Sequence, residues 1–280
     1  MPHVLRFRST FVLTALLALM FSGMLTGCNV IEQRSNEPGH INPVYYRHGA
    51  TSLEGYIAYP KDAYFSKKKY PAVLVIHEWW GLNDYAKRRA DQLADLGYIA
   101  LAADMFGGGR NSDNVEDAKA WSSALYGTPL MAQRAQAALD VLRKDPRVDA
   151  DRIIVIGYCF GGTAAVELAY SGAPVKGAVS FHGNPVPPTD EQAAALKARL
   201  LILIGAMDPM FDTAATKKLT DGLNKTNADF EIISYSGSVH SFTSPQADTR
   251  NMEGVAYNKN ADERSWKQLQ VFMKQVFEQK

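Results

Sequence analysis

Residues 152–165 read RIIVIGYCFGGTAA, the most informative stretch of the chain. Its β-branched run predicts a buried strand, and the small residues that follow predict a tight turn into a helix. Cys159 lies at the apex of this turn, between Gly157 and Gly161. A Cβ at either glycine would clash, because the turn brings strand and helix close together. The pattern is typical of a nucleophile elbow with a thiol as nucleophile, although a buried cysteine in a tight loop is the alternative.

The composition is that of an ordinary globular protein. The chain has 280 residues, of which 46% are hydrophobic and 21% charged, and its formal net charge is +1. A nearly neutral chain gives no reason to expect a nucleic-acid partner. Nothing in the sequence indicates an obligate protein partner.

The N-terminus has the features of a secretory signal. Arginines precede residues 11–24, an apolar stretch that is too short to span a bilayer comfortably. Residues 25–28, LTGC, resemble a bacterial lipobox. We therefore expect residues 1–27 to be a lipoprotein signal peptide and Cys28 to be diacylated. An ordinary signal peptide that is cut near Gly27, with no role for Cys28, is the alternative.

The residues after the lipobox predict a lipid-anchored protein of the bacterial cell envelope. Asn29 follows Cys28, and by resemblance to bacterial lipoproteins this favours the outer membrane, facing the periplasm. Residues 28–43 are polar and contain glycine and proline, which is typical of a flexible tether. We expect residues 44–280 to form a single domain.

The cysteine count supports a use for the elbow thiol. Cys28 and Cys159 are the two cysteines of the chain. If Cys28 carries lipid, Cys159 has no partner for a disulfide. Exported proteins normally pair or avoid cysteines because their compartment is oxidising, so a retained thiol indicates a function, although burial could also protect it.

Apolar runs alternate with helical patterns along the domain. Strands are predicted over residues 71–77, 98–104, 152–158, 175–181, 200–205 and 230–235, after a hairpin within residues 44–60. Helices are predicted over residues 85–96, 115–126, 131–144, 160–170, 190–198, 213–224 and 262–279. Solid apolar strands that alternate with helices predict an α/β fold, a doubly wound and mainly parallel sheet with helices on both faces.

Two further residues follow predicted strands. Asp208 comes just after strand 200–205, and His240 lies in a small polar loop after strand 230–235. Taken singly, they could be a turn-forming aspartate and a surface histidine. The chain order Cys159, Asp208, His240, each at a strand end, is that of nucleophile, acid and base in α/β-hydrolases.

Five motifs in order resemble the dienelactone hydrolase family. They are HEWWGLN at 77–83, ADMFG at 103–107, GYCFGG at 157–162, AMDP at 206–209 and HSF at 240–242. The resemblance implies an α/β-hydrolase fold, no metal or cofactor, and a Cys–His–Asp triad acting on small esters or lactones. It implies Cys159 as nucleophile, His240 as base and Asp208 as the acid that orients the base.

The resemblance also implies roles for residues around the thiol. Glu78 matches a glutamate that helps to form the thiolate, with a solvent-facing loop carboxylate as the alternative. The backbone amides of Phe160 and Trp79 match the family's oxyanion hole, where an amide after the nucleophile points at developing negative charge.

The chain departs from the dienelactone-cleaving members at two positions. Ser244 stands where they have an arginine that holds the substrate carboxylate, and near the second arginine position the chain offers only Lys119. Bidentate carboxylate binding is therefore not expected. We expect an aromatic pocket instead, with core packing as the alternative, formed by Trp79, Trp80, Phe106 and Phe242. His77 and His182 also end strands and could line the pocket.

Two functions are compatible with these patterns. The first is an ester or lactone hydrolase that forms a thioester on Cys159; the second is a non-catalytic envelope lipoprotein that binds a ligand in the same pocket. A hydrolase thiol should be alkylated faster near neutral pH than a free cysteine, and His240→Ala should slow it. A thiol redox role is disfavoured because no second cysteine is present to resolve the product.

Overall fold

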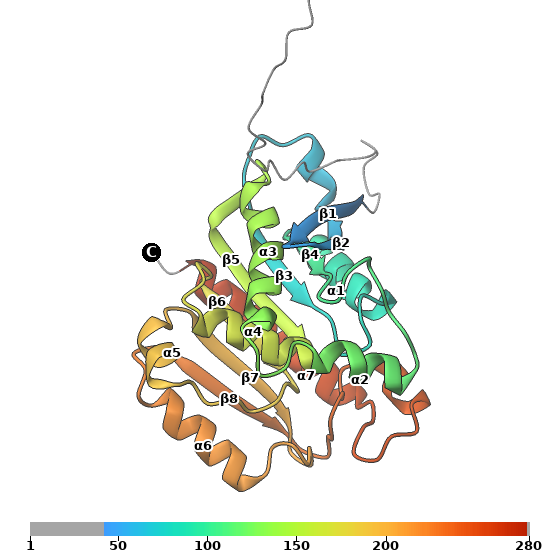
Figure 1. Ribbon diagram of the computed structural model, residues 1–280. Helices are drawn as coiled ribbons and strands as arrows, with labels where there is room; N and C mark the ends of the chain where they lie inside the picture. The colour runs from blue at the N-terminus through green and yellow to red at the C-terminus, as the bar shows by residue number, and fades with distance from the viewer. Residues whose placement is uncertain (1–41, 279–280) are drawn as a thin grey trace, which may run out of the picture.

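One eight-stranded sheet organises the chain. The computed structural model describes residues 42–278, and the strand order is β1-β2-β4-β3-β5-β6-β7-β8 (Figure 1). The strands are β1 (Asn42–His48), β2 (Thr51–Ala58), β3 (Tyr70–Ile76), β4 (Ile99–Ala103), β5 (Val148–Tyr158), β6 (Gly177–Phe181), β7 (Arg199–Gly205) and β8 (Phe230–Tyr235). The hairpin β1–β2 joins β4 in antiparallel fashion, and all other neighbours are parallel. The predicted doubly wound, mainly parallel sheet is confirmed.

Helices cover both faces of this sheet (Figure 1). They are α1 (Asp84–Asp95), α2 (Val115–Ser123), α3 (Leu130–Lys144), α4 (Phe160–Tyr170), α5 (Asp190–Ala195), α6 (Thr213–Leu223) and α7 (Lys259–Glu278), with 3-10 turns η1 (Lys61–Tyr64) and η2 (Pro245–Thr249). Successive strand residues point to opposite faces, so each strand feeds two cores. Ile153 and Val155 belong to the core that also contains side chains of α3, α4 and α6, whereas Ile154 and Ile156 belong to the core that contains side chains of α1 and α7. The strands are solid apolar runs because both faces are buried.

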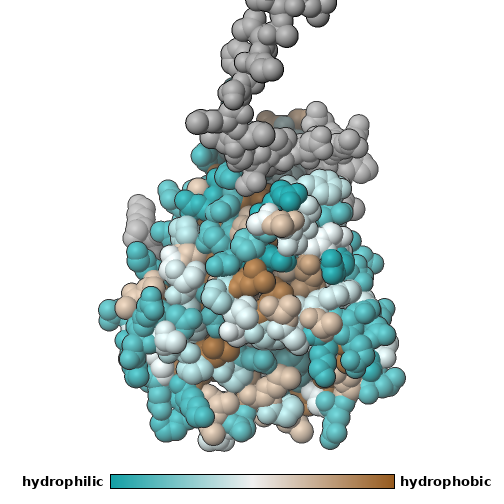
Figure 2. Space-filling model, viewed as in Figure 1, coloured by the Kyte–Doolittle hydropathy of each residue, from teal (hydrophilic) through white to brown (hydrophobic). Residues whose placement is uncertain are grey.

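Most apolar side chains lie in these two cores. On the face shown in Figure 2, hydrophilic residues predominate and hydrophobic ones form small separate patches. Among the described residues, no helix is both long and apolar enough to cross a membrane.

Several element boundaries differ from those predicted. Strand β5 begins at Val148 and not at residue 152, and α2 and α5 end at Ser123 and Ala195, each three residues earlier than predicted. Helix α7 begins at Lys259, three residues before the predicted Asp262. Strand β1 begins at Asn42, inside the segment predicted as a tether. The predicted signal peptide, Cys28 and nearly all of the predicted tether lie outside the described residues.

Parallel strands place the predicted site residues together. Strands β3 to β8 run in one direction, so their carboxyl ends lie along one edge of the sheet. The residues that follow them include Glu78, Cys159, His182, Asp208 and His240. Segments that are far apart in the chain therefore meet at this edge.

Candidate active site

The turn between β5 and α4 is a strained elbow. Cys159 has φ 53° and ψ −116°, a conformation that residues with a side chain rarely adopt. A Cβ on Gly157 would lie 1.9 Å from the carbonyl oxygen of Gly161, and one on Gly161 would lie 2.2 Å from that of Ile76. The predicted strand, turn and helix are confirmed, as is the steric reason for both glycines.

A cavity of about 280 Å³ opens beside the elbow. Its wall includes the half-buried thiol of Cys159 together with His240 and Ser241. A larger cavity of about 540 Å³ lies between β1 and α3, but it does not contain the thiol. The smaller cavity is therefore the candidate active site.

His240 and Asp208 form a buried pair next to the thiol. Nδ1 of His240 lies 2.8 Å from Oδ2 of Asp208, and each residue is 4% exposed. The backbone N–H of Met210 donates to the other carboxylate oxygen at 2.9 Å, which holds Asp208 in place. Because Nδ1 donates to the carboxylate, Nε2 is the basic nitrogen of the ring. Nε2 is buried and has no hydrogen-bond partner among the described residues, so it is free to accept a proton.

The surroundings of His240 favour its protonated form. Burial by itself lowers the pKa of His240, but the attraction of the Cys159 sulfur and the contact with Asp208 outweigh it. The pKa of His240 therefore lies well above its ordinary value. An imidazole with a raised pKa is a stronger acceptor for a thiol proton.

Two backbone amides near the thiol have no acceptor. Phe160 is the first residue of α4, where helix amides lack partners within the helix and the helix dipole is positive. The amides of Phe160 and Trp79 donate to no acceptor among the described residues. Trp79 also lines the cavity. Both amides are thus available to a negative oxygen, as an oxyanion hole requires.

Glu78 lies behind the cavity wall. It is 3% exposed, and its Oε1 accepts a hydrogen bond from the hydroxyl of Ser241 at 2.9 Å. Burial raises the pKa of Glu78, and the hydrogen bond from Ser241 and the positive charges of His240 and Arg250 only partly oppose this. Glu78 does not itself line the cavity and makes no hydrogen bond to Cys159 within the described part of the chain. The solvent-facing alternative for Glu78 is wrong, while its role in thiolate formation stays a prediction.

The aromatic pocket differs from the predicted one. Trp80 lines the cavity, but Phe106 and Phe242 do not. Phe106 packs against the rings of His77, Phe160 and Trp121, and Phe242 is fully buried against Tyr235 and His182. Both phenylalanines are core residues because burying a whole aromatic ring in the core is more favourable than leaving it in an open wall.

The histidines beside the pocket are core residues as well. His77 and His182 are fully buried, and neither lines the cavity. Nδ1 of His182 accepts the backbone N–H of Cys159 at 3.1 Å, so this side chain contacts the elbow from behind. The prediction that either histidine could line the pocket is wrong.

Several cavity residues could not be found from the sequence. They are Tyr126, Met210, Met252 and Val255. Each lies in a turn or irregular segment where an apolar side chain looks like an ordinary core residue. Lys119 is exposed and also lines the cavity, and Arg250 stacks on Trp80 with its guanidinium 3.9 Å from the ring centroid.

Comparisons with known proteins agree with this architecture. Residues 53–277 match the model of the Dienelactone hydrolase family. A protein of Saccharolobus solfataricus described as a putative carboxymethylenebutenolidase is 28% identical over 270 residues, which cover 83% of this chain and 98% of that protein. A Bradyrhizobium protein described as a probable 2-oxo-3-(5-oxofuran-2-ylidene)propanoate lactonase is 27% identical over 216 residues, covering 73% of this chain and 83% of its own.

A solved structure has the same fold. It is a dienelactone hydrolase-like promiscuous phosphotriesterase from metagenomic libraries, with 34% sequence identity and a TM-score of 0.81. The match covers 86% of this chain and all of the other. The family match spans nearly the whole domain, including the strand ends that carry the thiol, the carboxylate and the imidazole. The chain therefore belongs to the dienelactone hydrolase family and is a hydrolase with the α/β-hydrolase fold.

Proposed function

We propose that this enzyme hydrolyses small esters or lactones through a thioester on Cys159, with His240 as the base and Asp208 as the acid that orients it. The observation that carries the proposal is that the elbow thiol and His240 line one cavity, while Asp208 lies 2.8 Å from Nδ1 of the same imidazole. A thiol and an imidazole on one cavity wall, with a carboxylate on the imidazole, support a covalent acyl-transfer mechanism.

In the first half-reaction, Nε2 of His240 takes the thiol proton and the thiolate attacks the substrate carbonyl carbon. The amides of Phe160 and Trp79 donate to the oxyanion of the tetrahedral intermediate. The carbon–oxygen bond to the leaving group then breaks, and His240 returns the proton to that oxygen. An ester releases an alcohol at this step, whereas a lactone opens and keeps its hydroxyl on the acyl chain.

In the second half-reaction, water replaces the leaving group. His240 accepts a proton from water as the hydroxide attacks the thioester carbon. The intermediate collapses to a carboxylic acid and expels the Cys159 thiolate, which regains the proton from His240. Since a thiolate leaves a tetrahedral intermediate more readily than an amine does, activated esters and lactones are better substrates than amides.

The cavity supports a small substrate. Its volume of about 280 Å³ and its two tryptophans, Trp79 and Trp80, suit a compact unsaturated ring. The names of two similar proteins, a carboxymethylenebutenolidase and a lactonase, support lactones as the substrate class. Lys119 is the one lysine or arginine among the described residues of the cavity wall, and it can pair with an anionic substituent as a point charge.

A substrate panel with nucleophile variants tests the proposal. Aryl esters, lactones and thioesters are assayed with wild-type protein, Cys159→Ala and Cys159→Ser. We expect Cys159→Ala to lower kcat by at least about 10³-fold, because removing a nucleophile abolishes the covalent route. Cys159→Ser keeps a nucleophile of similar shape and should retain more activity than the alanine variant. Wild-type rates in Cys159→Ala would show that the nucleophile is another group.

We also propose that Cys28 anchors the enzyme by acyl chains to the bacterial envelope, at the outer membrane facing the periplasm. The lipobox-like residues 25–28 support this. Asn42 pairs with Ile57 near the end of β2, and Ala58 pairs with Ala100 near the start of β4. The chain thus enters the domain at the edge of the sheet opposite the cavity, which leaves the cavity accessible when the anchor is embedded.

Membrane fractionation of cells that express the full chain tests the anchor. Cys28→Ser removes the acylated sulfur, so the enzyme should leave the detergent-soluble membrane fraction. Separation of inner and outer membranes on a density gradient tests the destination. If Cys28→Ser stays in the membrane fraction to the same extent as wild type, lipidation of this residue is not the anchor.

A further inference from the structure

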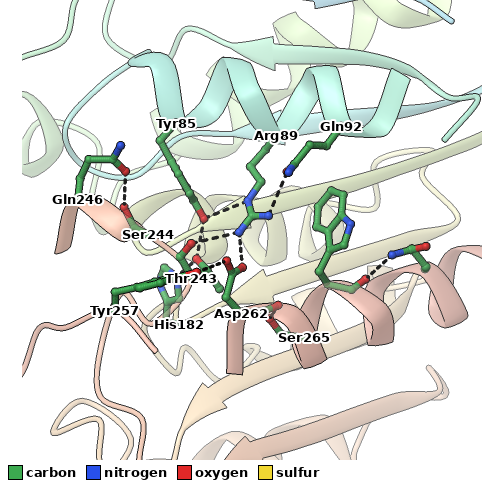
Figure 3. A network of polar contacts seen from close by, with 12 residues as sticks. Tyr85, Arg89, Gln92, His182, Thr243, Ser244, Gln246, Tyr257, Asp262 and Ser265 are labelled. Atoms are coloured by element: carbon green, nitrogen blue, oxygen red, sulfur yellow. Dashed lines mark hydrogen bonds and ion pairs between the residues drawn. The ribbon is translucent and has the colours of Figure 1, made fainter. Parts of the chain in front are cut away.

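A buried polar network joins the elbow to the loop that carries His240. Figure 3 shows the part of this network around His182, Thr243 and Arg89. His182 lies at its centre: Nδ1 accepts the backbone N–H of Cys159 at 3.1 Å, and Nε2 lies 2.8 Å from Oγ1 of Thr243. Thr243 follows His240 by three residues and is fully buried. One imidazole therefore contacts both segments whose side chains must react together.

The network continues from Thr243 into α1 and α7. Oγ1 of Thr243 lies 2.6 Å from the hydroxyl of Tyr85, and Nε of Arg89 donates to the same hydroxyl at 3.3 Å. The guanidinium also donates to the backbone carbonyl of Thr243 at 3.1 Å and pairs with Asp262 at the start of α7. Arg89 is 5% exposed and Asp262 is partly exposed, so this largely buried ion pair ties two helices to the loop.

The hydrogen-bond directions define the state of His182. Nδ1 accepts the amide of Cys159 and so carries no proton; Nε2 must then carry it and donate to Thr243. Burial, the charge of His240 and the charge of Arg89 all lower the pKa of His182, well below its ordinary value. A neutral ring is also required by position, because the imidazoles of His182 and His240 lie 5.3 Å apart.

The elbow needs such support. Cys159 holds a positive φ of 53°, and its amide is shared between the carbonyl oxygen of Phe181 at 2.9 Å and Nδ1 of His182. A strained conformation persists only where the surroundings over-determine it. The thiol and the imidazole sit on separate loops, so their relative position depends on contacts that bridge the loops.

We propose that His182 and Thr243 are positioning residues of the hydrolase: together they tie the backbone of Cys159 to the loop of His240 and hold thiol and imidazole in reacting geometry. The proposal rests on the proposed roles of Cys159 and His240. Neither positioning residue lines the cavity, so both act through the residues that they hold.

The test uses two substitutions at Thr243. Thr243→Val removes the hydroxyl and leaves the volume unchanged, whereas Thr243→Ser keeps the hydroxyl. We expect Thr243→Val to lower kcat by about 10- to 100-fold with KM nearly unchanged, because small displacements of reacting groups cost about this much. Thr243→Ser should recover most of the loss.

A substrate-free readout separates positioning from folding. The pH profile of Cys159 alkylation depends on the ionisation of the thiol and of the imidazole beside it. The profile should therefore change in Thr243→Val and be close to that of wild type in Thr243→Ser. Thr226→Val is the matched control, since Oγ1 of Thr226 donates to the carbonyl of Leu223 and accepts from the amide of Ala228, far from the cavity. It should lower the melting temperature but leave kcat and the alkylation profile unchanged.

A second variant guards against failure of Thr243→Val to fold. His182→Asn keeps an acceptor for the Cys159 amide but is too short to reach Thr243, so it should show the same loss of kcat. If these variants lower the melting temperature and leave kcat and the alkylation profile as in wild type, the network only stabilises the fold and the proposal is wrong. Failure of the proposed function itself would appear separately, as full activity in Cys159→Ala.

Discussion

Two buried histidines at the carboxyl edge of the sheet differ in their partners and in the direction of their pKa shifts. His240, after β8, meets the carboxylate of Asp208 and the sulfur of Cys159, and its pKa is raised well above the ordinary value. His182, after β6, meets a backbone amide, a hydroxyl and the charge of Arg89, and its pKa is lowered well below that value. Their rings are 5.3 Å apart.

The difference shows that the partners of a buried histidine assign its role. A carboxylate at Nδ1 leaves Nε2 as a base that can hold a proton, which is what the role proposed for His240 requires. An amide at Nδ1 removes that basicity and turns the ring into a rigid connector. The positive charges of His240 and Arg89 add to the effect of burial and lower the pKa of His182, so the pKa values of the two rings shift in opposite directions.

The largest effect is expected when His240 loses its carboxylate. Asp208→Asn leaves the imidazole in an environment closer to that of His182, so kcat should fall by about 10²- to 10⁴-fold with little change in KM. Asp212→Asn is the matched control, because this exposed aspartate caps α6 through an oxygen that asparagine also provides. A kcat for Asp208→Asn within threefold of wild type would contradict the assignment of the acid.

The two histidines should give stability opposite pH dependences. The raised pKa of His240 stabilises the folded state. This contribution to the free energy of unfolding is complete below about pH 6.5 and is lost as pH rises through the pKa of the folded state. The lowered pKa of His182 has the opposite effect, so the free energy of unfolding decreases as pH falls below about 6.5. Relative to wild type, His240→Gln should therefore lose most stability at low pH and His182→Gln at high pH.

Urea unfolding between pH 5 and pH 9 measures both differences. One proton changes the pH dependence of the free energy of unfolding by at most about 1.4 kcal/mol per pH unit, and urea titrations resolve a change of this size. The predicted difference between the histidines is wrong if the stabilities of both variants approach that of wild type as pH changes in the same direction.

Glu78 offers a smaller test of the charge around His240. Burial raises the pKa of Glu78, so its ionised form destabilises the fold as pH rises above about 4.5, the ordinary value. Glu78→Gln should raise the melting temperature by a few degrees at pH 7 and not at pH 4, and it should lower kcat if the carboxylate assists thiolate formation. Thermal unfolding at the two pH values checks this, and an equal change at both would show that the charge is not responsible.

The smallest effect is expected at the cavity mouth. Lys119 is exposed, so its pairing with an anionic substrate is worth at most about 1 kcal/mol, or about a fivefold rise in KM for Lys119→Met. A neutral ester of similar size should show no change, and neither should kcat for either substrate. An equal rise in KM for both substrates would mean that the lysine contributes packing and not charge.

Local patterns were enough to predict the sheet, the elbow and the residues that follow each strand. Glycines beside Cys159 indicated a turn without room for a Cβ, and solid apolar runs indicated strands buried on both faces. These features depend on neighbours in the chain, which is why periodicity and residue type report them. The parallel arrangement then brought Cys159, Asp208 and His240 to one edge.

The tertiary structure alone decided which side chains face the cavity. Phe106 and Phe242 were predicted to line the pocket and are core residues, whereas Tyr126 and Met252, which no local pattern singled out, line the cavity. The bridge through His182 likewise depends on how loops of three distant strands meet. A side chain's direction at a loop is set by packing against segments far away in the chain, and no local pattern carries that information.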